Sequence, residues 1–340
     1  MLKLSKQQKA KLKKLDIRHF DELIHDQPKE WLQKKFSTTS SKYPVNVTRL
    51  MRNVIWQLRE NILLKKKSPL KELIRTFWYM YIKPTLTRAE SLSDETDQYN
   101  QLIRVLADMV KKYNIMEYKD IGFRDDNRAN RKVGLNANII LYAEKIGHAD
   151  FLSEIAEKYQ VSMIAFGGQP SIMNIEYLVD DIKSKKIDIR RSFFIFSIVD
   201  FDPSGWIVRN SFIDDLKRFG IKNIKNIELI HPDMLLPDEV LLSRVFVKDN
   251  EQTHKINTSW LREMKKYQYN NYQYIQPEKD RKNNRIIYGL EAEAVSSKRI
   301  TQVLDELVPP LLGKNEKALE IIMLEKLRKS IQKLILHKIS

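Results

Sequence analysis

Two carboxylates with one residue between them follow an apolar run past the middle of the chain. The run SFFIFSIV covers residues 192–199, and Asp200 and Asp202 come next, before Pro203 and Gly205 break the pattern. A carboxylate at the end of a buried strand is costly unless a partner neutralises it, and hard oxygen ligands of this kind select Mg²⁺. The spacing therefore predicts a divalent-metal site, with an ordinary Asp-Pro turn as the alternative.

The elements around these acids alternate between strand and helix from about residue 138 onward. Apolar runs predict strands and the segments between them predict helices; the expected strands are 138–144, 161–166, 193–200 and 226–232, and the expected helices are 148–160, 170–184 and 205–220. Such alternation indicates a parallel sheet covered by helices on both faces. Functional groups of these sheets gather beyond the carboxyl ends of the strands.

Glu144 ends the first expected strand, so it should lie at the same sheet edge as Asp200 and Asp202. We therefore predict these three carboxylates as the ligands of a bound Mg²⁺. The alternative for Glu144 is an ion pair with Lys145 or Arg209, because a single acid after a strand is common.

Two further acids and two histidines lie near the expected site. Glu291 and Glu293, in the segment LEAEAV, could approach the same sheet edge, or they could be ordinary acids on a helix surface. His148 and His231 lie near strand ends, but a lone histidine is more often structural, so we assign them no role.

A second candidate site is the segment RTFWY, residues 75–79. Arg75 and Tyr79 are four residues apart and should share one face of a helix. A phenol, with a pKa near ~10, is a weak nucleophile at neutral pH unless a neighbour assists it. A guanidinium one turn away could hold a phosphate or favour the phenolate. The alternative is an aromatic core stripe, and Tyr81 is the second candidate for a nucleophile.

The rest of the chain divides by pattern into three parts. Residues 1–45 form a basic helical extension, and residues 46–136 contain three expected helices, at 47–64, 68–82 and 94–113, before an expected hairpin at 118–135. Three helices followed by a hairpin is the order of a winged helix. Residues 137–340 hold the α/β part, and we expect its end, from about residue 250, to be helical. The sequence thus predicts a multi-domain α/β protein.

Several short segments, in this order, resemble the topoisomerase VI A-subunit (Spo11-like) family. That family carries a winged-helix domain followed by a TOPRIM parallel α/β domain. The segments that carry the resemblance are RTFWY, SLSDETDQYNQLIRVLADMV, YAEKIGHADFL, IAFGGQPS, DFDPSGWIV and LEAEAV. The resemblance covers about residues 46–310, and the shared order of the segments is its main support.

The resemblance implies a type IIB DNA-cleaving and rejoining enzyme. Tyr79, helped by Arg75, would attack a DNA phosphodiester and form a 5′-phosphotyrosine link, with Mg²⁺ held by the TOPRIM acids. It also implies a homodimer on double-stranded DNA and, since no Gly-rich ATPase segment occurs in the chain, a separate ATPase subunit. The alternatives are a metal-dependent TOPRIM nuclease of a plasmid-defence type and a non-catalytic DNA-binding protein of the same fold.

Charge favours a polyanionic partner. The 340 residues include 60 Lys and Arg and 44 Asp and Glu, which gives a net charge of +16. There is no cysteine. Such a balance is typical of nucleic-acid binding. The residues that we expect to contact DNA are Lys65, Lys66, Lys67, Lys71, Arg124, Arg128, Arg131 and Lys132. No membrane-spanning run or signal peptide is found, so we expect a cytoplasmic, nucleoid-associated protein.

Overall fold

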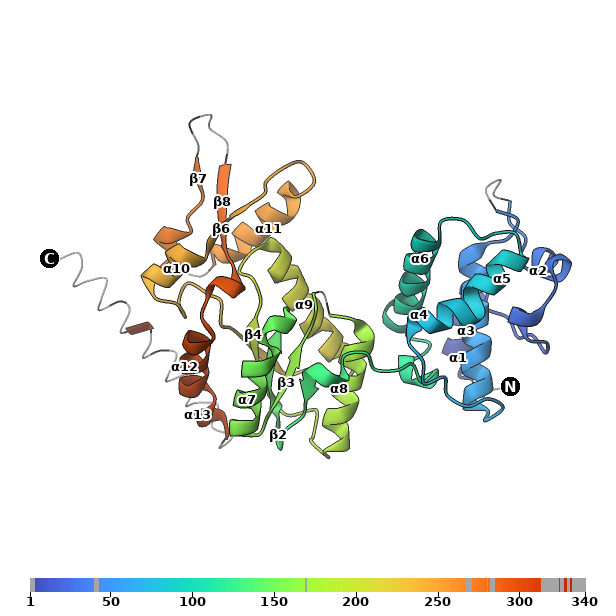
Figure 1. Ribbon diagram of the computed structural model, residues 1–340, viewed down its shortest axis with the longest axis horizontal. Coiled ribbons are helices and arrows are strands. Elements are labelled where there is room, and N and C mark those ends of the chain that lie inside the picture. The colour runs from blue at the N-terminus through green and yellow to red at the C-terminus, as the bar shows by residue number, and fades with distance from the viewer. Residues whose placement is uncertain are drawn as a thin grey trace. The chain divides into compact units, whose positions relative to one another are not determined.

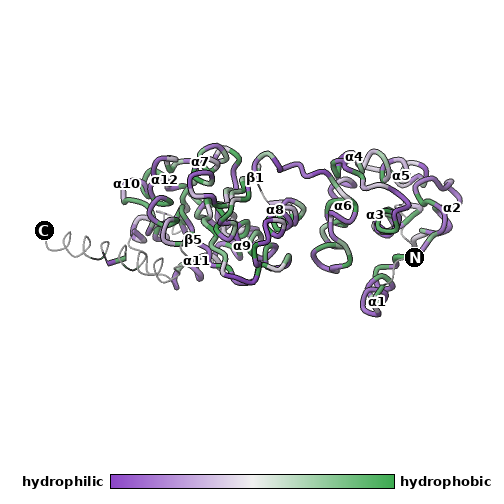
Figure 2. Tube along the Cα trace, turned by 90° about the horizontal axis from the view of Figure 1, so that it is seen from below, coloured by the Kyte–Doolittle hydropathy of each residue, from purple (hydrophilic) through white to green (hydrophobic). Residues whose placement is uncertain are grey.

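The chain folds into two compact units, Met1–Asp126 and Asn127–Ser340, in the computed structural model (Figure 1). We refer to them as the N-terminal unit and the C-terminal unit. The structure describes residues 4–39, 43–168, 170–266, 271–279, 281, 285–312, 324, 327, 328 and 331. The chain passes from one unit to the other through the mostly hydrophilic residues 124–132, drawn purple in Figure 2.

The N-terminal unit is built from helices. Its elements are α1 (Lys6–Lys14), η1 (Ile24–Asp26), α2 (Lys29–Phe36), α3 (Val47–Leu63), α4 (Ile74–Phe77), η2 (Trp78–Ile82), α5 (Lys83–Arg88), α6 (Glu95–Ala107), η3 (Asp108–Lys112) and η4 (Tyr118–Asp120). The elements η2 and η3 are π-helical turns, and η2 lies between α4 and α5 without a break. Single π-helical turns inside α-helices are frequent at functional sites.

Buried amide side chains of α3 hold the basic N-terminal segment against this unit. The Asn53 amide accepts a hydrogen bond from the backbone of Arg18 (2.8 Å) and donates one to the carbonyl of Asp16 (3.0 Å). The Gln57 side-chain amide holds the next part of this segment, because it accepts a hydrogen bond from the backbone N–H of Ile24 (2.9 Å). Residues 1–45 therefore belong to the same compact unit as α3.

The predicted hairpin at 118–135 is wrong. These residues, all of which the structure describes, form η4, η5 (Arg128–Asn130) and the short strand β1 (Arg131–Lys132), with no pairing between two arms of a hairpin. Residues 121–124 instead bond to residues 70–72 through three backbone hydrogen bonds of 2.7–3.0 Å. These bonds hold residues 70–72 outside a helix, with Lys71 at a φ of 56°, so the helix expected from residue 68 begins only at Ile74.

The C-terminal unit contains the predicted parallel sheet. Its strand order is β1-β3-β2-β4-β5, in which β1 is antiparallel to β3 and the other neighbours are parallel. The remaining strands and the helices between them are β2 (Asn136–Ala143), α7 (Ala149–Tyr159), β3 (Val161–Ala165), α8 (Ile172–Ser184), β4 (Phe193–Ile198), α9 (Pro203–Arg218) and β5 (Ile224–Glu228). Sequence reasoning therefore predicted the four parallel strands and the three helices between them, but not the antiparallel edge strand β1.

Both faces of this sheet are buried, as the continuous apolar strands require. Ile139 and Leu141 of β2 pack in one cluster with α7, whereas Ile140 and Tyr142 pack in another with α8 and α9. The two sets alternate along the strand because successive side chains of a strand point to opposite faces. Figure 1 shows the helices around the sheet.

A second, antiparallel sheet follows in the C-terminal unit, where only helices were expected. Its order is β6-β8-β7, from β6 (Arg244–Val247), β7 (Glu278–Lys279) and β8 (Arg285–Leu290). The remaining elements of the C-terminal unit are η6 (Ile146–His148), α10 (Pro237–Ser243), α11 (His254–Met264), η7 (Tyr272–Tyr274), η8 (Ala292–Ala294), α12 (Ser297–Leu307) and α13 (Pro309–Leu312). The helix expected near the C-terminus lies mostly outside the described residues.

The stacked pair Tyr142 and Phe212 gives a test of the main core. Phe212 is 0% exposed, and its ring lies 4.1 Å from that of Tyr142 at 16°. Phe212→Ala should lower the free energy of unfolding by about 3 to 5 kcal/mol, because it leaves a cavity in a packed core. Phe246→Ala, at a phenylalanine that is 77% exposed, should change it by less than about 0.5 kcal/mol. Chemical denaturation of both variants measures the difference; equal losses would contradict this packing.

Candidate functional site

The two aspartates are presented by an extended pairing between the two sheets of the C-terminal unit. Phe201, between them, exchanges two backbone hydrogen bonds with Leu290 of β8 (2.9 and 3.0 Å) and is buried. Because side chains alternate along an extended segment, Asp200 and Asp202 both face away from the side that Phe201 takes.

Each aspartate uses one oxygen to hold the local backbone. Asp200 Oδ1 accepts a hydrogen bond from the backbone of Ala292 (2.8 Å). Asp202 is the N-cap of α9 and accepts one from the backbone of Gly205 (2.7 Å), with Pro203 at the first helical position. An acid at a helix N-terminus is favoured by capping and by the helix dipole. The sequence Asp-Pro-x-Gly therefore fixes Asp202, and the backbone of Ala292 fixes Asp200.

Glu144 lies at the same edge, as predicted. It follows Ala143, which is paired in register with Ile198 at the end of β4, and its backbone N–H bonds to the carbonyl of Ile198 (3.2 Å). Its Oε2 atom is buried and has no hydrogen-bond partner among the described residues. Burial raises the pKa of Glu144, and the charges of Asp200 and Asp202 raise it further.

Burial and a neighbouring negative charge also raise the pKa of Asp202. Burial raises its pKa most, and the charge of Asp200 adds to the rise, although hydrogen bonds from the backbone of Gly205 and Ser204 work in the other direction. Besides burial, the charges of neighbouring carboxylates raise the pKa of both Glu144 and Asp202, so these acids interact with one another. The predicted ligand set is therefore one electrostatic group.

Lys145 supplies positive charge to this group. Its ammonium pairs with Glu291, with Glu293 (3.1 Å) and with Asp200 (3.4 Å). These hydrogen bonds outweigh the effect of burial and raise the pKa of Lys145. Glu291 and Glu293, whose role the sequence left open, thus meet Asp200 through a shared lysine. The alternative in which Glu144 pairs with Lys145 or Arg209 is not seen, since Lys145 pairs with other acids and Arg209 with Glu228.

The residues present fit a Mg²⁺ ion in chemistry but not in present arrangement. Their donors are hard carboxylate oxygens, and the unpartnered Oε2 of Glu144 is the kind of atom that a bound cation satisfies. Within the described ranges, however, no three carboxylates or histidines converge closely enough to hold a metal ion. Two aspartate oxygens are held by backbone N–H groups, and the Lys145 ammonium lies among the acids.

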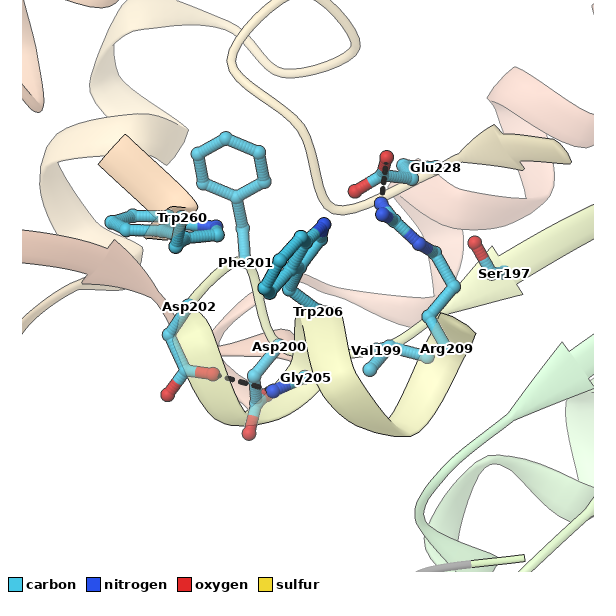
Figure 3. A pocket seen from close by; sticks show the side chains of 10 residues that line it. All are labelled: Ser197, Val199, Asp200, Phe201, Asp202, Gly205, Trp206, Arg209, Glu228 and Trp260. Atoms are coloured by element: carbon cyan, nitrogen blue, oxygen red, sulfur yellow. Dashed lines mark hydrogen bonds and ion pairs between the residues drawn. The ribbon is translucent and has the colours of Figure 1, made fainter. Parts of the chain in front are cut away.

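A small pocket is lined by both aspartates together with Trp206, Arg209 and Glu228, among other residues. Figure 3 shows the carboxylates of Asp200 and Asp202 beside Gly205, with the ion pair of Arg209 and Glu228 on the far side of Trp206. This ion pair therefore does not neutralise the aspartates.

The two histidines near the strand ends are neutral at physiological pH. Burial lowers the pKa of His231 to about 3, with a smaller effect from the charge of Arg209. Burial also lowers the pKa of His148. Both results agree with the structural role that the sequence favours for a lone histidine.

Tyr79 lies in the π-helical turn η2 of the N-terminal unit. Its hydroxyl accepts a hydrogen bond from Nη2 of Arg75 (3.0 Å), and the guanidinium also stacks between the rings of Tyr79 (5.3 Å) and Tyr99 (4.3 Å). The ammonium of Lys83 lies 5.1 Å from the Tyr79 ring. Arg75 and Tyr79 thus meet as their spacing predicts, and Lys83, four residues further on, joins them.

The structure separates the two candidate tyrosines. Tyr79 is 45% exposed, whereas Tyr81 is 6% exposed and packs edge-to-face on His25. The Tyr81 hydroxyl accepts a hydrogen bond from Lys67 (2.6 Å). A nucleophile must reach its substrate, so the exposed Tyr79 is the better candidate.

The predicted DNA contacts fall into two groups. Lys65, Lys66, Lys71 and Arg124 of the N-terminal unit and Arg128 of the C-terminal unit are exposed. Three others are engaged within their own unit: Lys67 with Tyr81, Arg131 with Asp181 and Lys132 with Glu157. The Arg131 side chain is 1% exposed, which removes it from the surface that DNA can reach.

The chain matches no protein-family model, and no curated protein sequence matches it. In the part of the chain that the structure describes, no helix has the length and apolar character that crossing a membrane requires.

Gly205 gives a test of the aspartate turn. A Cβ at this position would lie far inside van der Waals contact with the carbonyl oxygen of Asp200. Gly205→Ala should therefore lower the free energy of unfolding by about 2 kcal/mol or more, since the rigid backbone must shift. The matched control is Gly147→Ala, where a Cβ has nothing within 4 Å. Thermal and chemical unfolding compare the two; a neutral Gly205→Ala would show that the turn is not held as described.

Proposed function

We propose that this protein cleaves and rejoins double-stranded DNA with Tyr79 as the nucleophile. The observation that carries the proposal is the hydrogen bond from Arg75 to the hydroxyl of an exposed tyrosine inside a π-helical turn. A guanidinium beside a phenol oxygen stabilises the negative charge that develops there and can hold a phosphate nearby. Attack on a phosphodiester would leave a 5′-phosphotyrosine and a free 3′-hydroxyl.

The acids of the C-terminal unit would hold Mg²⁺ in this proposal. Glu144, Asp200 and Asp202 are the ligands we propose, with Glu291 and Glu293 near the same group. When bound, Mg²⁺ supplies positive charge for the phosphate oxygens and for the leaving 3′-oxygen. Because Lys145 pairs with Asp200 and Glu291, a cation that binds Asp200 must displace the Lys145 ammonium or bind beside it.

The proposed assembly is a homodimer on DNA. One chain offers one such tyrosine and one acid group, so it breaks one strand. Breaking both strands requires two copies related by a two-fold axis, which matches the symmetry of the duplex backbone. Strand passage driven by ATP would need a separate ATPase subunit. A TOPRIM domain in the C-terminal unit and a nucleoid-associated location remain part of this proposal. So does a winged-helix role for the N-terminal unit, with no wing formed by a hairpin at residues 118–135.

The first test is a covalent adduct. The wild-type chain, supercoiled DNA and Mg²⁺ are incubated, and detergent and protease are then added. We expect residual peptide on DNA 5′ ends, because a phosphotyrosine bond survives denaturation. Tyr79→Phe removes only the hydroxyl, so adducts should disappear while binding of DNA is retained.

The matched control is Tyr81→Phe in the same π-helical turn, which should still form adducts. Adducts in Tyr79→Phe but not in Tyr81→Phe would transfer the role to Tyr81. Cleavage by wild type without any adduct would instead favour the metal-dependent nuclease, in which water is the nucleophile.

A second test concerns the metal site and can be read without DNA. Lys145→Gln should bind Mn²⁺ about tenfold more tightly than wild type, because a competing positive charge worth about 1 to 2 kcal/mol is removed. Asp200→Asn should weaken binding strongly. The control is Lys158→Gln, whose ammonium pairs with Asp305. Titration calorimetry measures all four proteins; equal affinities for wild type, Lys145→Gln and Asp200→Asn would contradict the proposed ligands.

A further inference from the structure

The hydroxyl of Tyr79 has two charged side chains as partners, Arg75 and Glu95. Its oxygen accepts a hydrogen bond from Arg75 (3.0 Å), and Glu95, whose carboxylate is bonded to Lys83 (2.7 Å) and to the adjacent Trp78 (3.4 Å), is its second side-chain partner. A hydroxyl that accepts from a cation and donates to an anion is polarised in one direction. This is the arrangement in which a phenol loses its proton most readily to its acceptor.

Glu95 is held in place from several directions. It is the first residue of α6, where the helix dipole favours an anion. Its Oε2 accepts a hydrogen bond from Lys83 (2.7 Å) and its Oε1 accepts a longer one from the indole N–H of Trp78 (3.4 Å). Trp78 is fully buried, which fixes its indole N–H group. The carboxylate is therefore anchored beside the phenol.

The surrounding charges keep Glu95 ionised. Hydrogen bonds, from Lys83 first and then from Trp78 and Tyr79, hold the pKa of Glu95 below its usual range. Arg75 adds a further positive charge next to the Tyr79 ring. Two further acids lie on the same helical segment: Asp94, which caps α6, and Asp97. Burial raises the pKa of the neighbouring Tyr99, and the charge of Asp126 raises it to a smaller extent.

We propose that Glu95 is the general base that takes the phenolic proton of Tyr79. The inference rests on the proposed cleavage of DNA and assigns a further catalytic residue to it. As the bond from the Tyr79 oxygen to phosphorus forms, the phenolic proton passes to a carboxylate oxygen of Glu95. The bond from phosphorus to the 3′-oxygen breaks, and that oxygen leaves with the electron pair and takes a proton from water. Rejoining runs through the same steps in reverse.

Lys83 is a positioning residue in this scheme rather than a base. Its ammonium has three donors and no acceptor lone pair, and it is paired with Glu95. It therefore orients the carboxylate while it leaves the proton of Tyr79 to Glu95. Arg75 is excluded as a base for the same reason, because a guanidinium stays protonated in proteins.

The experiment measures the rate of adduct formation against pH in wild type, Glu95→Gln and Asp97→Asn. Glu95→Gln keeps the size of the side chain and an acceptor oxygen but removes the basic carboxylate. At neutral pH its rate should fall about 10²-fold or more, the usual contribution of a general base. Asp97→Asn removes a carboxylate from the same first turn of α6 and should keep the wild-type rate.

The slope of the profile separates a base from a structural residue. With an ionised carboxylate as base, the wild-type rate should be nearly flat between about pH 6 and pH 8. Without it, the reaction needs the phenolate, so the Glu95→Gln rate should rise about tenfold per pH unit over that range. A merely structural role for Glu95 would lower the rate without changing the slope.

The outcomes distinguish this inference from the proposed function. Adducts from wild type together with an unchanged slope in Glu95→Gln would overturn the role of Glu95 and leave the cleavage reaction standing. A wild-type chain that forms no adduct at any pH would overturn both. Slow, steeply pH-dependent adduct formation in Glu95→Gln, with Asp97→Asn like wild type, is the expected result.

Discussion

The acid site depends on the pairing of Phe201 with Leu290. These two residues join the parallel sheet to the antiparallel one, and Phe201 is buried as part of the main core. The core therefore fixes the backbone of Asp200 and Asp202 without touching their carboxylates, which remain on the opposite side. The repulsion between neighbouring carboxylates opposes folding, and the pairing holds them together against it.

The sequence predicted the elements whose pattern is determined locally. The strands around Asn138 and Phe193 are mostly apolar, and their burial on both faces favours that pattern. The expected hairpin failed because a sequence pattern does not show which segment a stretch of chain bonds to. Residues 121 and 122 form a turn, with Gly122 at a φ of 74°, and the partner of residues 121–124 is the stretch at residues 70–72, far away in the chain. The antiparallel sheet was missed because β6 and β8 lie far apart in the sequence.

The sequence indicated some contacts of each candidate site and not others. The spacing of four between Arg75 and Tyr79 indicated their contact, and the same spacing to Lys83 was a signal that could have been read. Glu95 gave no such signal, because it reaches Tyr79 from another helix. The sequence likewise placed Glu144, Asp200 and Asp202 at one sheet edge. It could not show that Lys145 joins them to Glu291 and Glu293, more than a hundred residues away.

The two sites differ in how they treat charge, and the difference bears on the proposed chemistry. At Tyr79, a guanidinium donates to the hydroxyl and an anchored carboxylate is its second partner, so charges of both signs surround the group before a substrate arrives. At the acid group, negative charge is in excess, and a lysine compensates part of it. The first arrangement suits a nucleophile and the second suits a cation. The nucleophile site is built from residues of the N-terminal unit, and the acid group is built from residues of the C-terminal unit. Packing within one unit therefore cannot provide both the nucleophile and the cation ligands. A reaction that uses both must bring Tyr79 of one chain to an acid group of the same chain or of a second copy.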